Sequence, residues 1–199
     1  MSGLRTRRLV WCAAGRRHAL DPDPREADRG RVATVLAAPE VGRALADVLA
    51  GLAVPEEGEV QRGGGRVALV PPGGALLPDL TVAANLALGL TVRSAADARA
   101  RVEVFARLLQ VDGALDLHPD RLSAAQQLRA GMARAVAARP GLVVVEDRAG
   151  VPPCGPAVAA AAGHVAVVVV TDDLDRVRPV PGRRWTAVEV DGRPAGGSG

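Results

Sequence analysis

Residues 122–147 read LSAAQQLRAGMARAVAARPGLVVVED, and they carry the strongest fold signal in the chain. Apolar side chains recur at helical spacing, including Leu128 and Val136, and predict an amphipathic helix over residues 123–138. A continuous apolar run at residues 142–145 follows closely and predicts a strand covered on both faces. A helix that leads so directly into a buried strand is typical of an α/β fold.

The same alternation of strands and helices extends outward from this stretch. Residues 149–171 lack charge but contain several prolines and glycines, so we expect a loop, a short helix and a buried strand rather than a membrane span. Together these elements predict an α/β domain with a mostly parallel sheet. The other expected elements are strands at residues 32–36, 67–70, 165–170 and 186–190, the last at a sheet edge, and helices at residues 44–52 and 95–111.

The composition narrows the range of functions. The chain has 199 residues and a formal net charge of +3, and all 25 of its basic residues are arginine. Without lysine, the chain cannot form a Schiff base or supply the lysine of a phosphate-binding P-loop. Acidic residues are interspersed with the arginines and aromatic residues make up 2% of the chain, so we expect no nucleic acid partner.

Length and cysteine content suggest the organisation of the chain. We expect one domain over residues 1–194 and a flexible tail at 195–199. Cys12 and Cys154 lie far apart without metal-ligand spacing, so we expect no metal site and a reducing, cytoplasmic location. The apolar run at residues 9–14 is too short for the core of a signal peptide.

Five segments, taken in order, carry a family resemblance. Residues 122–129, LSAAQQLR, look like the motif L-S-G-G-Q followed by Q-x-R, and residues 133–140, ARAVAARP, look like the A-R-A-L-x-x-x-P that ends the same helix. Residues 142–147, LVVVED, stand in the place of a Walker B strand, and residues 75–86 and 50–60 look like A-L-L-P-x-L-T-V-x-E-N-L and A-G-L…P-x-x-G-x-V. The chain therefore resembles the ATP-binding subunit of ABC transporters.

The resemblance implies a fold, cofactors and partners. It implies a P-loop NTPase-like cassette with a small helical subdomain at about residues 80–138. The family binds ATP and Mg²⁺, pairs with a second cassette as a homo- or heterodimer, and docks on a membrane permease subunit. By resemblance, the permease contact lies at about residues 72–109, and the location is cytoplasmic or peripheral at the inner face of the plasma membrane.

The phosphate-binding loop is the clearest departure from the family. An ungapped alignment places residues 36–44 over the motif G-x-x-x-x-G-K-[ST]-[ST], with Gly42 at the lysine and Arg43 at the hydroxyl that binds Mg²⁺. A one-residue shift pairs Gly42 and Arg43 with the G-K of the motif, but Ala44 then cannot bind Mg²⁺. Arg43 either touches an anion at the start of a helix or is a solvated arginine. We favour the second interpretation, because a planar guanidinium does not fit where a compact ammonium belongs.

The acidic and switch positions depart from the family as well. Glu146 and Asp147 stand where the family has Asp for the metal and Glu for the attacking water, so the order is reversed. They form either a weak residual catalytic site or a pair of acids at a strand end, and we favour the pair of acids. Pro72 replaces the Q-loop glutamine, and Asp172 replaces the switch histidine with a charge that would repel a γ-phosphate.

The signature segment is partly retained. By resemblance, Ser123 and Gln126 would cap a nucleotide held by the partner cassette. The same two residues also fit a capping box for the following helix, and the sequence does not decide between these roles.

These residues support three interpretations. The first is a degenerate cassette that does not hydrolyse ATP and is a structural or regulatory partner in a transporter complex. The alternative is a functional ABC-type ATPase that energises membrane transport with atypical motifs. The third is a relic that folds without a task.

Overall fold

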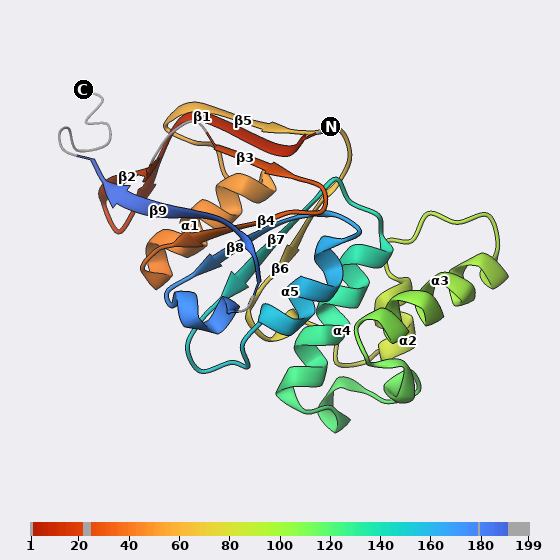
Figure 1. Ribbon diagram of the computed structural model, residues 1–199. Helices are drawn as coiled ribbons and strands as arrows, with labels where there is room; N and C mark the ends of the chain where they lie inside the picture. Colours follow the sequence, from red (N-terminus) through yellow and green to blue (C-terminus); the bar gives the residue numbers. More distant parts are fainter. Residues whose placement is uncertain (1, 22–24, 179, 191–199) are drawn as a thin grey trace.

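The computed structural model describes residues 2–21, 25–178 and 180–190, and this part of the chain forms one nine-stranded sheet with helices against it (Figure 1). The strand order is β3-β1-β2-β9-β4-β8-β7-β6, and β5 also pairs with β1. The half from β9 to β6 is parallel, and the half from β3 to β2 is antiparallel. The predicted α/β class with a parallel core is confirmed.

Valine-rich strands form the centre of the parallel half. The two central strands are completely buried, because both of their faces are covered. Their register pairs Leu142 with Ala166 and Asp147 with Thr171, so both strands end at the same edge of the sheet. The parallel strands are β4 (Val32–Leu36), β6 (Val67–Val70), β7 (Leu142–Asp147), β8 (Ala166–Thr171) and β9 (Gly182–Glu189).

The N-terminal residues form an antiparallel half that the sequence analysis did not predict. Leu4 and Thr6 are buried whereas Arg5 and Arg7 are exposed, which is the two-residue period of a strand with one solvated face. The antiparallel strands are β1 (Ser2–Ala13), β2 (Arg16–Asp21), β3 (Arg25–Asp28) and β5 (Glu57–Arg62).

The prediction of an edge strand at residues 186–190 was wrong. β9 begins at Gly182 and lies inside the sheet, parallel to β4 on one side and antiparallel to β2 on the other. Its alternating sequence shows that one face is solvated, and such a face also occurs within a sheet.

Helix α1 (Pro39–Ala50) lies between the parallel core and the antiparallel strands (Figure 1). Leu45 and Leu49 are fully buried in one cluster with Trp11 and Val144. The helix ends at Gly51, whose positive φ of 85° lets its backbone N–H donate to the last carbonyls of the helix. The helix begins at Pro39 and not at residue 44 as predicted. Most of residues 36–44, where the phosphate loop was expected, is therefore helical.

The other face of the parallel core is covered by a second cluster of helices. Alternate residues of the central strands face this cluster, because side chains along a strand point to opposite faces. The cluster includes Val143 and Val167 from the strands, and Val158, Met132 and Phe105 from the helices. The helices are α2 (Val82–Ala87), α3 (Ala95–Leu108), α4 (Ala124–Ala137) and α5 (Gly155–Ala162), and the short 3₁₀ turns are η1 (Pro72–Gly74), η2 (Asp112–Ala114), η3 (Pro119–Arg121) and η4 (Leu174–Val177).

Helix α4 is fixed against η1 by a close approach of two backbones. A Cβ added to Gly131 would lie 2.5 Å from the Cα of Gly74, so neither position tolerates a larger residue. Arg134 also donates from Nη2 to the carbonyl of Gly74 at 3.2 Å. The segment that contains Pro72 is therefore anchored to α4 by packing.

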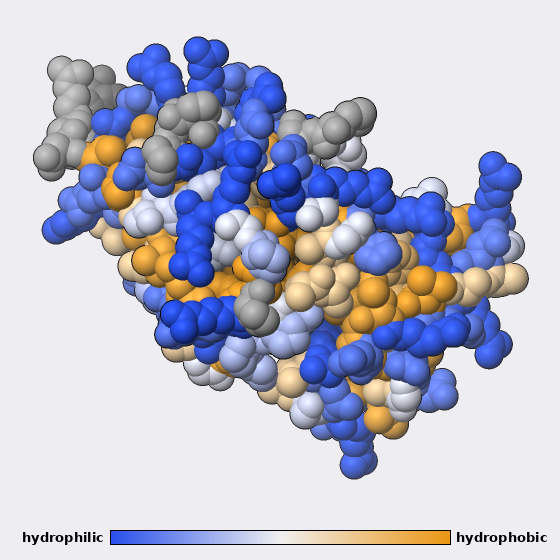
Figure 2. Space-filling view, in the orientation of Figure 1, coloured by the Kyte–Doolittle hydropathy of each residue, from blue (hydrophilic) through white to orange (hydrophobic). Residues whose placement is uncertain are grey.

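The visible surface divides in the same way as the fold. Strands β1, β3 and β5 lie under a mostly hydrophilic surface, whereas hydrophobic side chains gather over α3 and its junction with α5 (Figure 2). Among the described residues, no helix is both long enough and apolar enough to cross a membrane.

Candidate functional site

The phosphate-loop position lies at the carboxyl end of the parallel strands. β4 ends at Leu36 and α1 begins at Pro39, so only Ala37 and Ala38 connect them. The amide of Ala37 donates to the carbonyl of Thr171 at 2.9 Å, which holds this short connection against the end of β8. A glycine-rich loop that surrounds phosphates needs about six residues before its lysine, so the connection has no room for one.

The start of α1 is also unsuited to an anion. A helix N-terminus attracts anions through its free N–H groups and its partial positive charge. Here Pro39 removes one N–H group, and Glu40 places a negative charge in the first turn. The partial positive charge at this helix end is therefore already balanced by the carboxylate of Glu40.

Gly42 and Arg43 lie within α1 rather than in a loop. The amide of Gly42 donates to the carbonyl of Ala38 at 2.8 Å, which is an ordinary helical hydrogen bond. A Cβ at Gly42 would lie 2.9 Å from Cγ1 of Val170, so packing of α1 on β8 explains the glycine. Arg43 is exposed, in keeping with the solvated arginine that we favoured, and the described residues offer its side chain no hydrogen bond or ion pair.

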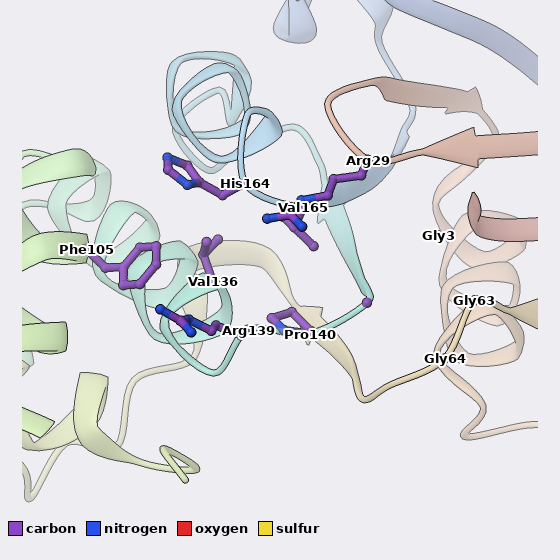
Figure 3. A pocket seen from close by; sticks show the side chains of 11 residues that line it. Gly3, Arg29, Gly63, Gly64, Phe105, Val136, Arg139, Pro140, His164 and Val165 are labelled. Carbon is purple, nitrogen blue, oxygen red and sulfur yellow. The ribbon is translucent and has the colours of Figure 1, made fainter. Parts of the chain in front are cut away.

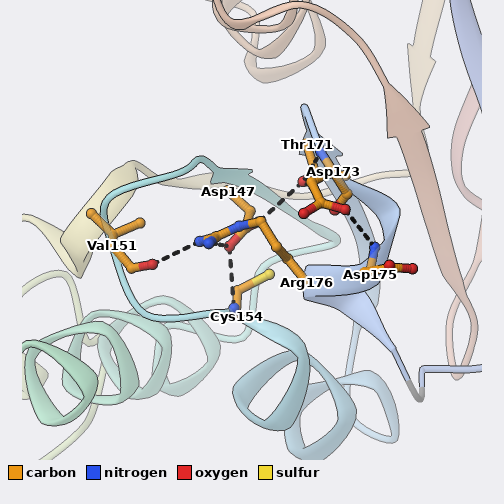
Figure 4. Close-up of polar contacts among 7 residues, drawn as sticks. All are labelled: Asp147, Val151, Cys154, Thr171, Asp173, Asp175 and Arg176. Carbon is orange, nitrogen blue, oxygen red and sulfur yellow. Dashed lines mark hydrogen bonds and ion pairs between the residues drawn. The ribbon is translucent and has the colours of Figure 1, made fainter.

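Asp147 is held by four donors at the end of β7 (Figure 4). Arg176 donates to both carboxylate oxygens, at 2.6 Å from Nε and 3.1 Å from Nη2. Thr171 donates from Oγ1 at 3.0 Å, and the amide of Cys154 donates at 3.2 Å. The Asp147 side chain is 1% exposed, and the hydrogen bonds to its carboxylate raise the pKa of Arg176. This carboxylate is therefore part of a buried ion pair that joins β7 to η4.

The network extends from Asp147 to the loop that follows β7. Arg176 also donates to the carbonyl of Val151 at 2.8 Å, so one guanidinium joins the strand end and the loop. Burial and the nearby charge of Asp147 raise the pKa of the Cys154 thiol, which keeps it protonated and unreactive. Cys154 is therefore a buried thiol without the environment of a nucleophile.

Little space remains between these groups. Glu146 is buried and accepts from Nη2 of Arg148 at 2.6 Å. The cavity lined by Gly42, Arg43, Glu146 and Asp147 has a volume of about 10 Å³, which is room for at most one water molecule. Asp172 lines the same cavity, and its Oδ1 is buried without a hydrogen-bond partner.

The structure therefore brings together four of the predicted site residues but does not fit the expected cofactors. The phosphates of ATP would find neither a loop nor enough volume here, and the carboxylates of Glu146 and Asp147 are paired with arginines. Within the described residues, no group of three or more His, Cys, Asp or Glu side chains is arranged to hold a metal ion.

Ser123 and Gln126 lie apart from this cavity, at the start of α4. Ser123 Oγ accepts from the amide of Gln126 at 3.3 Å, and Oε1 of Gln126 accepts from the amide of Ser123 at 2.9 Å. This reciprocal pair is the predicted capping box. Ser94 and Thr81 cap α3 and α2 through their own side chains, so capping by a hydroxyl is the rule in this part of the chain.

Arg176 and Thr171 were not predicted from the sequence as partners of Asp147. Thr171 was the residue before the switch position, and β7–β8 pairing could have placed it opposite Asp147. Arg176 gave no signal, because it is one of many arginines and its contact spans 29 positions.

The histidines form no catalytic group. His118 is exposed beside the carbonyl of Pro78, whereas His18 is buried against Trp11. His164 lies edge-on to Phe105 at the opposite end of the sheet from Asp147.

Comparison with curated proteins gives relatives of one kind. The chain is 33% identical over 135 residues to the spermidine/putrescine import ATP-binding protein PotA of Methylococcus capsulatus, covering 61% of this chain and 35% of that protein. It is 31% identical over 150 residues to the sulfate/thiosulfate import ATP-binding protein CysA of Caulobacter vibrioides, covering 67% of this chain and 44% of the relative. The chain thus spans less than half the length of these relatives, and no protein-family model matches it.

Solved structures show the same fold. A putative metal-chelate type ABC transporter in an inward-facing conformation aligns with a TM-score of 0.76 at 14% identity, covering 95% of this chain and 84% of that one. CbiO1 from Clostridium perfringens, described as part of the ABC transporter complex cbiONQ, aligns with a TM-score of 0.70 at 18% identity, covering 88% of this chain and 80% of that one.

Proposed function

From its relationship to the ATP-binding subunits of ABC importers, and from its ABC cassette fold, we propose that this chain is a degenerate cassette that does not hydrolyse ATP. Its role is then that of a structural or regulatory partner in a transporter complex. The site around Glu146 and Asp147 at the carboxyl ends of its parallel strands, here named the carboxyl-end site, then takes no part in ATP turnover.

One observation carries the proposal. The place where the phosphates would lie is filled by the chain itself, because only two residues connect β4 to α1 and the remaining cavity is about 10 Å³. Phosphoryl transfer depends on preorganised donors around the transferred group, and this site offers Glu40 and Asp172 instead.

The alternative of a working ATPase rests on Glu146 and Asp147, which remain at the end of the Walker B strand. For either to act on a metal or water, Arg148 and Arg176 would have to leave their carboxylates. Breaking a buried ion pair costs about 3–5 kcal/mol, so this path begins with a large penalty.

The direct test is an ATPase assay on the purified chain with Mg-ATP, beside the variants Glu146→Gln and Arg43→Ala. We expect no phosphate release above the level of either variant. Turnover by the parent chain that disappears in Glu146→Gln would overturn the proposal and support the ATPase alternative.

The proposed partners are a membrane permease subunit and a second cassette, at the inner face of the plasma membrane. Support for docking comes from the preserved helical part, where Asn85 is buried and bonds to the backbone of Leu77, Leu80 and Thr81. Co-purification of a permease or second cassette from native membranes would separate a working subunit from a relic. Failure to recover either would favour the relic.

A cap on the partner's nucleotide is a finer part of the proposal. Ser123 is exposed and stands at the start of α4, but its hydroxyl and Gln126 are already joined in the capping box. Ser123→Asp preserves the helix cap while adding a charge that would repel phosphate. If the complex is active, loss of the partner's turnover in this variant supports the capping role, and unchanged turnover removes it.

A further inference from the structure

Two large hollows lie at the amino ends of the parallel strands. One cavity has a volume of about 560 Å³ and an adjoining one about 630 Å³, and Phe105, Arg139 and His164 line both. Arg139 comes just before β7, and His164 comes just before β8. This region, which we name the amino-end cleft, is therefore on the opposite edge of the sheet from Asp147.

Four arginines from four separate segments line the amino-end cleft. Arg29 comes from the turn before β4, Arg93 precedes α3, Arg101 lies on α3, and Arg139 follows α4. In the described part of the chain, none of their guanidinium groups has a recorded hydrogen bond or ion pair. Figure 3 shows the side chains of Arg29 and Arg139 extending into the first cavity from different elements.

The charge of the cleft is strongly one-sided. Asp97 is the acidic residue that lines it, one helical turn before Arg101, and it offsets only part of the four positive charges. Arg29, Arg93 and Arg139 are exposed and Arg101 is half-buried. Cations that share a concave surface repel one another and raise the local concentration of anions. An anionic ligand would remove this repulsion.

Backbone geometry holds the cleft open. Arg139 has a positive φ of 51°, a conformation that is strained for a residue with a side chain. It ends α4 and turns the chain toward Pro140 and β7, which places the arginine at the border of the two cavities. On the opposite wall, Gly63 and Gly64 contribute no side chain that could fill the space.

Two ring side chains line both cavities, the buried Phe105 and the exposed His164. The rings of Phe105 and His164 meet edge to face, with centroids 5.9 Å apart and an interplanar angle of 78°. Each of the two volumes lies within the range of small-molecule pockets and has room for a ligand of nucleotide size. Guanidinium groups bind phosphate oxygens in a bidentate way, whereas the rings offer contact to a planar base.

We propose that the amino-end cleft binds a phosphorylated small molecule of nucleotide size. The phosphate contacts Arg29 and Arg139, and the ring system lies against His164 and Phe105. This site is separate from the carboxyl-end site and does not require the proposed loss of hydrolysis.

The test is calorimetric titration of the full chain with AMP, with inorganic phosphate and adenosine as separate arms. We expect AMP to bind more tightly than either fragment, and the affinity to fall as salt is raised. Arg139→Ala and Arg29→Ala should each weaken AMP binding by about tenfold or more, because each removes a charged partner of the phosphate. His164→Ala should weaken AMP but leave phosphate binding unchanged.

Arg43→Ala is the matched control, since it removes an exposed arginine at the other end of the sheet. We expect it to leave AMP binding unchanged. Binding that is lost in Arg43→Ala but kept in Arg139→Ala would overturn this inference and also the closed carboxyl-end site. No binding of any arm, or preference for an acidic peptide such as oligoglutamate, would overturn this inference and leave the proposed function standing.

Discussion

The two ends of the parallel sheet have opposite characters. At the carboxyl end, Asp147 and Glu146 are buried and each is paired with an arginine, around a cavity of about 10 Å³. At the amino end, arginines without recorded partners surround cavities of about 560 and 630 Å³. Charge that is neutralised within the chain stabilises the fold, whereas charge left open on a concave surface is available to a ligand.

The two ends of this sheet also differ from the usual arrangement of ligand sites in α/β proteins. Ligands of such sheets usually bind outside the carboxyl ends of the strands, where loops and helix N-termini converge. Here that edge has a two-residue connection from β4 to α1 and internal ion pairs, so the usual location is occupied by the fold itself. We therefore expect the stability of the fold to depend on the charges at the carboxyl end of the sheet but not on those at the amino end.

The largest effect is expected from breaking the buried ion pair. Arg176→Met leaves Asp147 without its guanidinium, and we expect the free energy of unfolding to fall by about 3 kcal/mol. This is the lower end of the range for such pairs, because Thr171 and the amide of Cys154 still donate to the carboxylate. Chemical denaturation of the parent and the variant measures it.

Arg178→Met is the matched control for that prediction. Arg178 pairs with Asp175 on the surface, and both side chains are about 70% exposed, so its loss should cost less than about 1 kcal/mol. Adding Asp147→Asn to Arg176→Met should restore part of the lost stability. Equal effects of the two arginine variants would show that the buried pair is not special.

Filling the small space beside α1 should have the next largest effect. Gly42→Ala places a methyl group 2.9 Å from Cγ1 of Val170, so we expect a loss of about 1–3 kcal/mol despite the higher helix propensity of alanine. Thermal unfolding measures the change. Gly113→Ala is a control without a close neighbour, and stabilisation by Gly42→Ala would mean that the carboxyl end has unused room.

Alkaline pH should weaken the same end of the sheet. Burial raises the pKa of Cys154 in the folded chain, so above about pH 9 the unfolded chain loses this proton while the folded chain keeps it. Stability should therefore fall as pH rises above 9, by about 1.4 kcal/mol per pH unit for this group. The chain has no lysine or tyrosine, so few other side chains titrate in this range.

The alkaline effect is measured by denaturation at pH 8 to 10.5, with Cys154→Ala as the comparison. We expect the variant to be less stable at pH 8 but less sensitive to rising pH. Cys12→Ala serves as a control for the other thiol, which is only partly buried. Parallel slopes for the parent and Cys154→Ala would contradict the assignment.

The smallest effect is expected at the amino end. Arg29→Ala and Arg139→Ala remove charges that have no recorded partner among the described residues, so the free energy of unfolding should change by no more than about 0.5 kcal/mol. A small gain is consistent with relief of repulsion. A loss of several kcal/mol at either position would mean that the amino-end cleft is held together by its arginines and is part of the structural core.

Much of the parallel core was predictable because its signals are local. Strand 32–36, strand 67–70 and the helix at residues 123–138 follow from apolar periodicity, and the capping box follows from Ser123 and Gln126. The start of α1 also has a local signal, because Pro39 and Glu40 are residue types favoured in the first turn of a helix. The expectation of a phosphate loop over residues 36–44 obscured it.

The charged parts of the molecule were harder to predict. The reversed pair Glu146 and Asp147 indicated the correct strand end. Their arginine partners were not predictable, because one is two positions away and the other is 29 positions away. The amino-end cleft was missed, because its arginines come from three regions that are far apart in the sequence, around Arg29, Arg93 to Arg101, and Arg139. In a chain with 25 arginines, composition alone does not distinguish the open charges from the paired ones.

The position of β9 has a consequence for the order in which the molecule assembles. β2 (Arg16–Asp21) and β4 (Val32–Leu36) are close in sequence, yet each has one of its two neighbours in β9 (Gly182–Glu189). On the ribosome, the first strands therefore wait with unpaired edges until most of the chain has been made. Such long-range closure slows folding and exposes edges that can pair with other chains. We therefore expect the last strand to be the step that commits the two halves of the sheet to one cooperative unit.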